Sequence, residues 1–200
     1  MRRISERALK PAVFAAALLP LAWLGWQAAF GSLGVNPIET VNRFLGDWAL
    51  RFLLIALAVT PARRIIGWSQ IARLRRMLGL FAFFYACLHV SSYVGLDQFF
   101  DWHALLKDVL KRRYITVGMI ALTLLVPLAV TSTDAMVRRL GGHRWRVLHR
   151  AVYLIAPLAV LHFWMMVKAD HGRPLLYGAI AAGLLGWRLW AGRRRLARPA

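Results

Sequence analysis

Six long apolar stretches constrain this chain more than any other feature. They lie at about residues 11–30, 47–62, 77–95, 114–132, 149–167 and 174–191. A hydrocarbon core about 30 Å thick is crossed by a helix of roughly 20 apolar residues. Because only short connections remain between the stretches, we expect residues 1–200 to form a single integral membrane domain. The predicted fold is all-α, a bundle of six transmembrane helices.

The overall composition also favours lipid as the surroundings of this chain. Hydrophobic residues make up 60% of the 200 residues, and the mean hydropathy is +0.53. Soluble domains are typically about 45–50% apolar. A chain of this length needs only one core, so the excess apolar surface must face something other than water. We expect a lipid bilayer to cover it.

The charge distribution distinguishes a membrane protein from a nucleic-acid-binding one. The formal net charge of +19, with 27 basic and 8 acidic residues, would suggest nucleic acid in a soluble protein. Here 19 of the 27 basic residues fall in clusters at 2–10, 63–76, 138–150 and 188–198, on one side of the predicted spans. Six of the eight acids fall on the other side. The positive-inside rule therefore predicts cytoplasmic termini and favours a membrane protein over a nucleic-acid-binding one. A cleaved signal peptide is the alternative for residues 1–30, but the long apolar run and the weak cleavage pattern Ala29-Phe30-Gly31 favour an uncleaved first span.

The histidines and the single cysteine narrow the possible metal sites. Cys87 stands alone, which excludes an internal disulfide and any multi-cysteine metal site. Three of the six histidines fall in predicted loops, namely His103, His143 and His171. The other three belong to the third and fifth spans, namely His89, His149 and His162.

His89 and His162 are predicted to reach the same depth in the membrane. His89 follows Arg76 by 13 residues, and His162 follows Arg150 by 12. At 1.5 Å per residue these distances are about 20 Å and about 18 Å. Because both spans run outward from the cytoplasmic side, the two imidazoles should meet in the outer half of the bilayer. His149 should lie near the inner edge.

Two imidazoles at one level on different helices suit a b-type heme, whose iron takes a nitrogen ligand on each face. The alternative is structural, because a membrane histidine often bonds a neighbouring carbonyl or hydroxyl, such as Ser91 or Ser92. Ionisable groups at this depth are costly and usually functional, so the matched depth favours a ligand pair. Seven nearby residues are candidates to line the ring: Phe81, Phe83, Phe84, Tyr85, Tyr93, Phe163 and Trp164.

The sequence leaves two alternative roles open for His149 and two for Arg150. On a straight helix, 13 residues separate His149 from His162 by about 140° around the axis. A kink at Pro157 would let His149 share the heme site; otherwise His149 holds a second cofactor at the cytoplasmic surface. Arg150 is a candidate clamp for heme propionates or a flavin phosphate. The alternative is an ordinary basic cluster with Trp145 as interfacial anchor.

Several stretches, in order, resemble the MsrQ family, formerly called YedZ. They are GVNPIETV (34–41), WALRFLLIALAVTPARR (48–64), LRRMLGLFAFFYACLH (74–89), RRYITVGMIAL (112–122) and PLAVTSTDAMVRRLGGHRWRVLHRAVYLIAPLAVLHF (127–163). This family is the heme-binding membrane subunit of the bacterial MsrPQ methionine-sulfoxide reductase system. The resemblance covers nearly the whole chain, apart from its ends and the 96–111 connection.

The resemblance implies a ferric-reductase-like bundle in the bacterial inner membrane that carries heme b and FMN. It implies electron transfer from respiratory quinones to a periplasmic molybdopterin reductase, MsrP, which repairs oxidised methionines. Its functional histidines match His89, His149 and His162. On this view the chain is an electron-transfer subunit whose own substrate is quinol.

The chain departs from the family pattern at two places, and two alternative functions remain open. LGGHRW is one residue longer than the usual family loop. Arg76 stands where related oxidases have a second histidine 13 residues before His89, which argues against a complete second bis-histidine heme. The rival functions are a stand-alone ferric reductase and a heme-free scaffold or transporter subunit.

Overall fold

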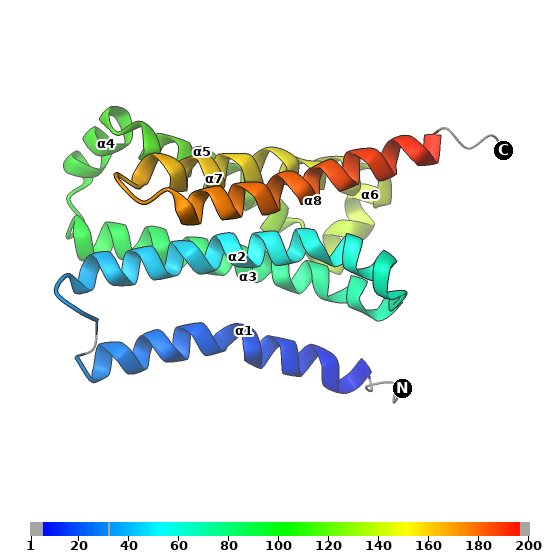
Figure 1. Ribbon diagram of the computed structural model, residues 1–200, viewed down its shortest axis with the longest axis horizontal. Helices are drawn as coiled ribbons and strands as arrows, with labels where there is room; N and C mark the ends of the chain where they lie inside the picture. Colours follow the sequence, from blue (N-terminus) through cyan, green and yellow to red (C-terminus); the bar gives the residue numbers. More distant parts are fainter. Residues whose placement is uncertain (1–5, 32, 197–200) are drawn as a thin grey trace.

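The structure is helical throughout the part of the chain that it describes. The computed structural model describes residues 6–31 and 33–196, and no strand occurs in those ranges (Figure 1). The elements, where η marks a short 3-10 or π turn, are α1 (Glu6–Ala29), α2 (Pro37–Ile66), η1 (Ser69–Arg73), α3 (Leu74–Ser92), η2 (Tyr93–Asp97), α4 (Trp102–Lys111), α5 (Arg113–Val130), α6 (Asp134–Leu148), η3 (His149–Ala151), α7 (Val152–Met166) and α8 (Gly172–Leu196).

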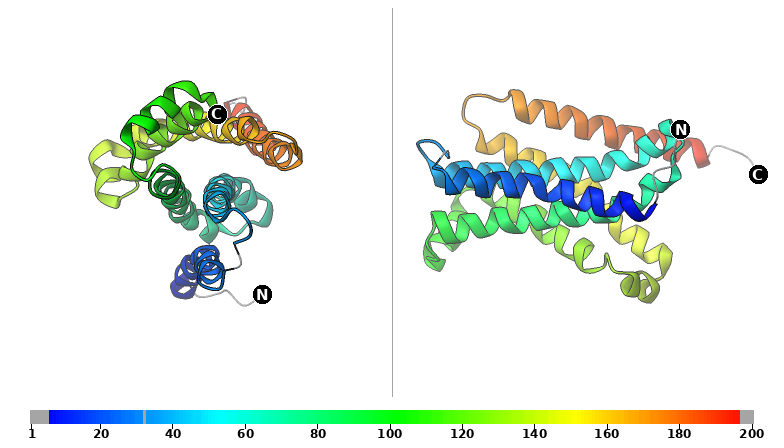
Figure 2. Two further views of the ribbon diagram at one scale, coloured as in Figure 1. Left: turned by 90° about the vertical axis from the view of Figure 1, so that its left-hand side faces the viewer. Right: turned by 90° about the horizontal axis from the view of Figure 1, so that it is seen from below.

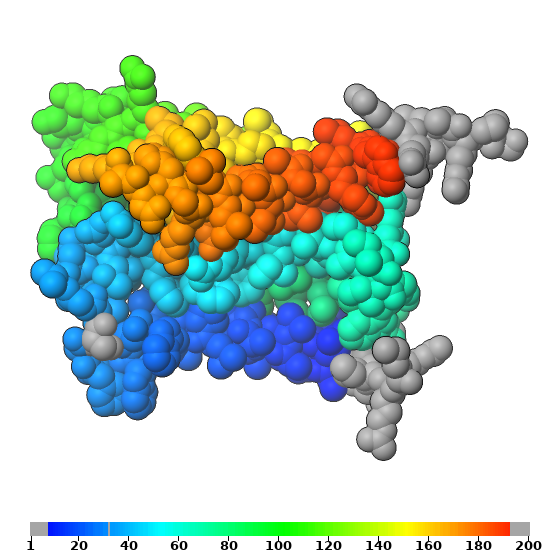
Figure 3. All heavy atoms as spheres, in the orientation of Figure 1, coloured from blue at the N-terminus to red at the C-terminus, as the bar shows by residue number. Residues whose placement is uncertain are grey.

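The long helices form three layers. Seen end-on, α2 and α3 lie in the middle, α1 lies on one side of them, and α5, α7 and α8 lie on the other (Figure 2). The space-filling view shows α8 against α2 and α1 along the lower edge (Figure 3). α3 and α7 run in the same direction, and α1 begins at the end of the bundle where α8 finishes (Figure 1). We call this the inner end, and the opposite end the outer end.

Five segments of the described chain are long and apolar enough to cross a membrane. They are Ala8–Ala29, Pro37–Ile66, Ser69–Asp97, Arg113–Val130 and Asp134–Met166. The protein is therefore a multi-pass membrane protein. The predicted sixth stretch lies within α8, which is not among these five, so the count of six spans stays a prediction.

Local sequence explains where several helices begin and end. The Asn36 side chain accepts the Glu39 backbone N–H at 3.2 Å before α2, and Pro37 takes the first helical position. Gly67 closes α2 in the left-handed region, with φ 73°. Asp101 caps α4 by accepting the N–H of Ala104 at 2.9 Å. The Asn36 cap thus begins α2, one of the helices that line the cavity described below.

An aromatic cluster joins the first two layers. Phe52 of α2 stacks on Phe81 and Tyr85 of α3, with ring centroids 5.6 and 5.2 Å away. Phe14 of α1 packs on Phe81 at 5.3 Å. The fully buried Tyr85 hydroxyl donates to the Ala17 carbonyl at 2.8 Å and so ties α1 to α3.

Two connections that the sequence predicted as loops are helical, and this corrects the prediction. The 96–111 connection contains α4, which carries His103 and buries Leu105 against the bundle. Residues 134–148 form α6, which carries His143 and is kinked at Gly141, with φ 74°. Both helices are too short or too polar to cross a membrane, so hydropathy did not reveal them. His171 lies in a connection, as predicted.

Candidate functional site

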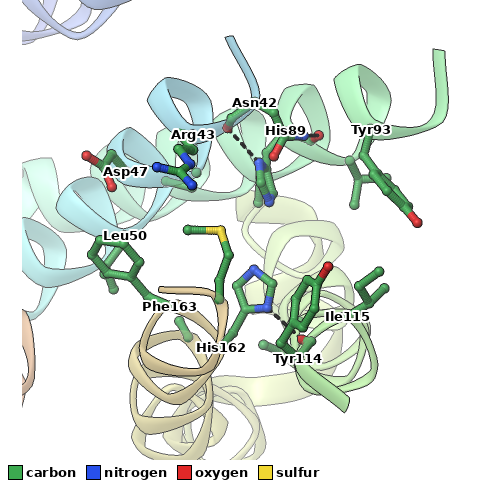
Figure 4. A pocket seen from close by; sticks show the side chains of 18 of the residues that line it. Asn42, Arg43, Asp47, Leu50, His89, Tyr93, Tyr114, Ile115, His162 and Phe163 are labelled. Carbon is green, nitrogen blue, oxygen red and sulfur yellow. Dashed lines mark hydrogen bonds between the residues drawn. The ribbon is translucent and has the colours of Figure 1, made fainter. Parts of the chain in front are cut away.

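The structure brings His89 and His162 together between the second and third layers. The two rings face one another near the outer ends of α3 and α7 (Figure 4). Their centroids are 6.2 Å apart, and their planes meet at 73°. The equal-depth reasoning from the sequence therefore placed the two side chains side by side.

Each imidazole is anchored through Nδ1 to a backbone carbonyl of the neighbouring helix. Nδ1 of His89 lies 2.9 Å from the Asn42 oxygen on α2, and Nδ1 of His162 lies 2.6 Å from the Tyr114 oxygen on α5. A carbonyl oxygen only accepts hydrogen bonds, so each Nδ1 carries the proton. Each neutral ring therefore keeps its Nε2 lone pair free, which is the arrangement of a metal-binding histidine.

The two rings line a cavity of about 860 Å³. Its walls come from α2, α3, α5 and α7 and are mainly apolar, with Leu50, Ala86, Leu122 and Ala159 among them. Pockets for small molecules and cofactors measure about 300–1,000 Å³. This cavity is therefore large enough for a cofactor between the two imidazoles.

Charged side chains surround the outer mouth of the cavity, and the sequence reasoning missed them. Asp47 lies 3.4 Å from Arg51 and 3.3 Å from Arg173, which links α2 to α8. Arg51 also donates to the Tyr177 hydroxyl at 2.8 Å. The basic residues of the lining are Arg43, Arg112, Lys168 and Arg173, and Arg51 lies outside the lining. The sequence did contain a signal for this basic mouth. Arg43 and Lys168 lie at the outer ends of predicted spans, the same end at which His89 and His162 were expected.

The predicted aromatic lining is only partly correct. Tyr93 and Phe163 line the cavity. Phe81 and Tyr85 instead belong to the aromatic cluster with Phe52, on the side of α3 that faces α1 and α2. The others outside the cavity wall are Phe83, Phe84 and Trp164. Residues four apart share a helix face, but the sequence does not say which neighbour that face meets.

His149 lies apart from the pair, in the η3 turn at the inner end. Its Nε2 is 3.2 Å from the Thr131 hydroxyl, and its ring stacks on Trp145 with centroids 3.9 Å apart. The Thr131 hydroxyl already donates to the Pro127 carbonyl at 2.6 Å. Nε2 of His149 is therefore the donor to Thr131. His149 therefore carries its proton on Nε2, whereas His89 and His162 carry theirs on Nδ1.

This placement separates the assignments left open by the sequence. Pro157 does not bring His149 into the cavity, because the 3-10 turn sets His149 outside α7. Arg150 is exposed and is not part of the cavity wall. A cofactor role for either residue stays a prediction and concerns the inner end of the molecule.

Replacing His149 with alanine is expected to leave binding at the His89–His162 pair intact. The change removes one hydrogen bond and one ring stack, which together are worth about 1–3 kcal/mol. We expect the Tm in detergent to fall by a few degrees, with an unchanged heme-to-protein ratio measured by the pyridine hemochrome assay. Loss of more than half of the heme would show instead that His149 is a ligand.

The side chains available as metal ligands limit which metal or metal-containing cofactor fits the cavity. No cluster of three or more His, Cys, Asp or Glu side chains able to hold a metal ion occurs in residues 6–31 and 33–196. Two opposed imidazoles alone do not complete the coordination of a bare transition-metal ion. They suit a metal whose equatorial ligands come from a macrocycle.

The comparisons with known proteins agree with this architecture. Residues 45–160 match the family described as ferric reductase like transmembrane component. The chain is 60% identical to the MsrQ protein of Rhodospirillum rubrum over 190 residues, covering 95% of this chain and 91% of the relative. It is 53% identical to the MsrQ protein of Caulobacter vibrioides, covering 94% and 90% of the two chains. That of Herminiimonas arsenicoxydans is also 53% identical, covering 94% and 87%.

These matches define first the class and then the family. The fold and the family match make the chain a ferric-reductase-like transmembrane protein. The relatives are described as heme-binding subunits of protein-methionine-sulfoxide reductase. The chain belongs to the MsrQ family, as the sequence motifs predicted.

Proposed function

We propose that this protein is a b-type cytochrome of the membrane, with His89 and His162 as the axial ligands of one heme. The observation that carries the proposal is the opposed pair of imidazoles with free Nε2 atoms in a cavity of cofactor size. The two rings, with centroids 6.2 Å apart, would hold the group between them through their Nε2 atoms.

The other cavity residues fit the same group. The apolar walls suit a porphyrin face, and the basic residues Arg43, Lys168 and Arg173 at the mouth suit its propionates. When bound, heme b would supply a one-electron carrier, and His89 and His162 would hold it. The chain contributes orientation, through the two Nδ1 anchors, and exclusion of water, through the apolar wall.

The proposed role is to pass electrons from respiratory quinones to a periplasmic, molybdenum-dependent MsrP-like reductase that repairs oxidised methionines. Family membership supports this role, because the relatives are named as heme-binding subunits of protein-methionine-sulfoxide reductase. The position of the pair toward the outer ends of α3 and α7 also supports it, since a short path then separates the pair from a partner docked there. Quinol would be the only substrate that this chain transforms.

FMN is proposed as a second cofactor at the inner end. Arg75 of α3 lies within electrostatic range of Arg188 on α8 and of His149. Nε of Arg188 is buried without a hydrogen-bond partner among the described residues. Guanidinium groups suit a phosphate. These residues, rather than the exposed Arg150, are the better candidates for the flavin phosphate.

The proposed topology is a single domain of six spans in the bacterial inner membrane, with both termini cytoplasmic. α8 runs the length of the bundle beside α2 and α7, which supports its assignment as the sixth span (Figure 1). The basic clusters at 63–76 and 138–150 lie at the inner end, where α1 begins and α8 finishes. This is the arrangement that the positive-inside rule favours.

A redox-difference spectrum of the purified full chain, followed by extraction of its cofactors, tests the proposal. We expect dithionite reduction to shift the Soret band and give sharp low-spin α and β bands, with protoheme in the extract. Reoxidation of the reduced protein by the reductase partner would support the role in methionine-sulfoxide repair. A heme-free preparation that still delivers electrons to that partner would overturn it, and reoxidation by ferric chelates alone would favour a ferric reductase.

A further inference from the structure

Each imidazole of the pair lies against a helical glycine of the neighbouring helix. A Cβ added to Gly118 of α5 would lie 2.8 Å from Nδ1 and 2.9 Å from Cε1 of His162. A Cβ added to Gly46 of α2 would lie 3.1 Å from the same two atoms of His89. Favourable contacts between nonbonded atoms begin at about 3.5 Å. Any larger residue at either position would therefore occupy space that an imidazole now fills.

The same helical turn that contains each glycine also provides the carbonyl that anchors the ring. The carbonyl of Asn42 is four residues before Gly46, and that of Tyr114 is four residues before Gly118. In an α-helix, residues four apart lie one above the other on one face. The imidazole thus lies over a bare turn and bonds the carbonyl at the start of that turn. The α2–α3 and α5–α7 pairs use this arrangement independently.

We propose that Gly46 and Gly118 are positioning residues for the axial ligands, an inference that rests on the proposed heme function. The missing side chain lets each ring reach a helix carbonyl whose second lone pair is still available. That hydrogen bond fixes the tautomer in which Nδ1 carries the proton, and it turns Nε2 toward the cavity. Among the glycines of the described chain, only these two would bring an added Cβ within 4 Å of a histidine.

The two positions should differ in severity. At Gly118 the contact of 2.8 Å is too short for any real Cβ, so His162 must move and stretch its bond to Tyr114. At Gly46 a displacement of His89 by a few tenths of an ångström relieves the contact. Residues that orient a metal ligand typically contribute about 10–100-fold to metal affinity. We expect the upper part of that range for Gly118→Ala and the lower part for Gly46→Ala.

The experiment compares these two variants with Gly79→Ala in the full chain. Gly79 is a helical glycine of α3, the helix that carries His89, and an added Cβ there meets nothing within 4 Å. For each variant we would measure the rate at which heme is released to excess apomyoglobin, the low-spin EPR spectrum and the midpoint potential of the heme. Gly118→Ala should lose heme at least tenfold faster and change its EPR g values. Its potential should rise, because an imidazole without the Nδ1 bond donates less electron density to the iron.

A heme-independent measurement separates this inference from the proposed function. In heme-free protein labelled with ¹⁵N-histidine, solid-state NMR should detect Nδ1-protonated imidazoles at His89 and His162, in addition to that of His171, whose Nδ1 lies 3.3 Å from the Ala169 carbonyl. Gly118→Ala should remove the signal of His162. Wild-type heme and EPR spectra in a folded Gly118→Ala variant would overturn the inference while leaving the heme assignment intact. A wild-type protein without heme would refute the proposed function, and an NMR spectrum without Nδ1-protonated rings at His89 and His162 would refute the inference itself.

Discussion

Replacing His89 or His162 with alanine is expected to abolish most of the heme bound by this protein. Each ring offers the lone pair of one Nε2 atom to the cavity. When one ring is removed, the other ring, 6.2 Å away in the wild type, is left without an opposing imidazole. His149 lies at the inner end with its Nε2 bonded to Thr131, so it is not a substitute. We expect the heme-to-protein ratio to fall more than about tenfold, because the change removes a ligand and not only its orientation.

His103→Ala is the matched control, because His103 is an exposed histidine of α4 at the same end of the molecule. This control should keep full heme. Imidazole added to the His162→Ala protein should enter the vacated space and restore a low-spin spectrum, which a purely structural histidine would not permit. Full heme in both alanine variants would end the assignment of the pair as axial ligands.

Replacing Phe81 with alanine is expected to give the largest loss of stability among changes outside the cavity wall. Phe81 is buried between Phe14 of α1 and Phe52 of α2, so its removal leaves a void between the first two layers. Phe→Ala changes in packed interiors cost about 3–5 kcal/mol. For a chain of this size that corresponds to a fall in Tm of about 10 °C.

The measurement uses the one thiol of the chain. Cys87 lies on the same helix and is partly buried, so a thiol-reactive dye reports the opening of this region during thermal unfolding in detergent. Leu80→Ala is the control, because Leu80 is a 38% exposed residue of α3 outside the aromatic cluster and should shift the Tm only slightly. An unchanged Tm in Phe81→Ala, or a loss of heme from the folded variant, would contradict the structural role of the cluster.

The sequence was sufficient for the membrane class and for the pairing of His89 with His162. Hydropathy located the apolar helices because lipid requires long, uncharged, fully hydrogen-bonded segments. Counting residues from the basic flanks placed the two histidines at one level because the rise of a helix is constant. The motif resemblance also identified the MsrQ family, which the comparisons confirm.

Other features could not be obtained in this way. α4 and α6 were predicted as loops because neither can span a bilayer, although caps at Asp101 and Thr133 mark their starts. Phe81 and Tyr85 were assigned to the ring wall because they are near His89 in sequence, yet their face of α3 meets α1 and α2. The basic mouth of the cavity gathers Arg43 from α2, Arg112 from the connection between α4 and α5, and Arg173 from α8.

By itself, the sequence of this protein determined that the chain is a membrane protein, where five of its apolar helical segments lie, and that His89 and His162 share one level. These properties depend on composition and on distance along one helix. Only the tertiary structure decided that Asn42 and Tyr114 offer their carbonyls to the two rings, that Gly46 and Gly118 make room for them, and that His149 stays outside. Those contacts join residues up to 48 positions apart. They depend on the rotation and packing of neighbouring helices, which no periodicity within a single helix specifies.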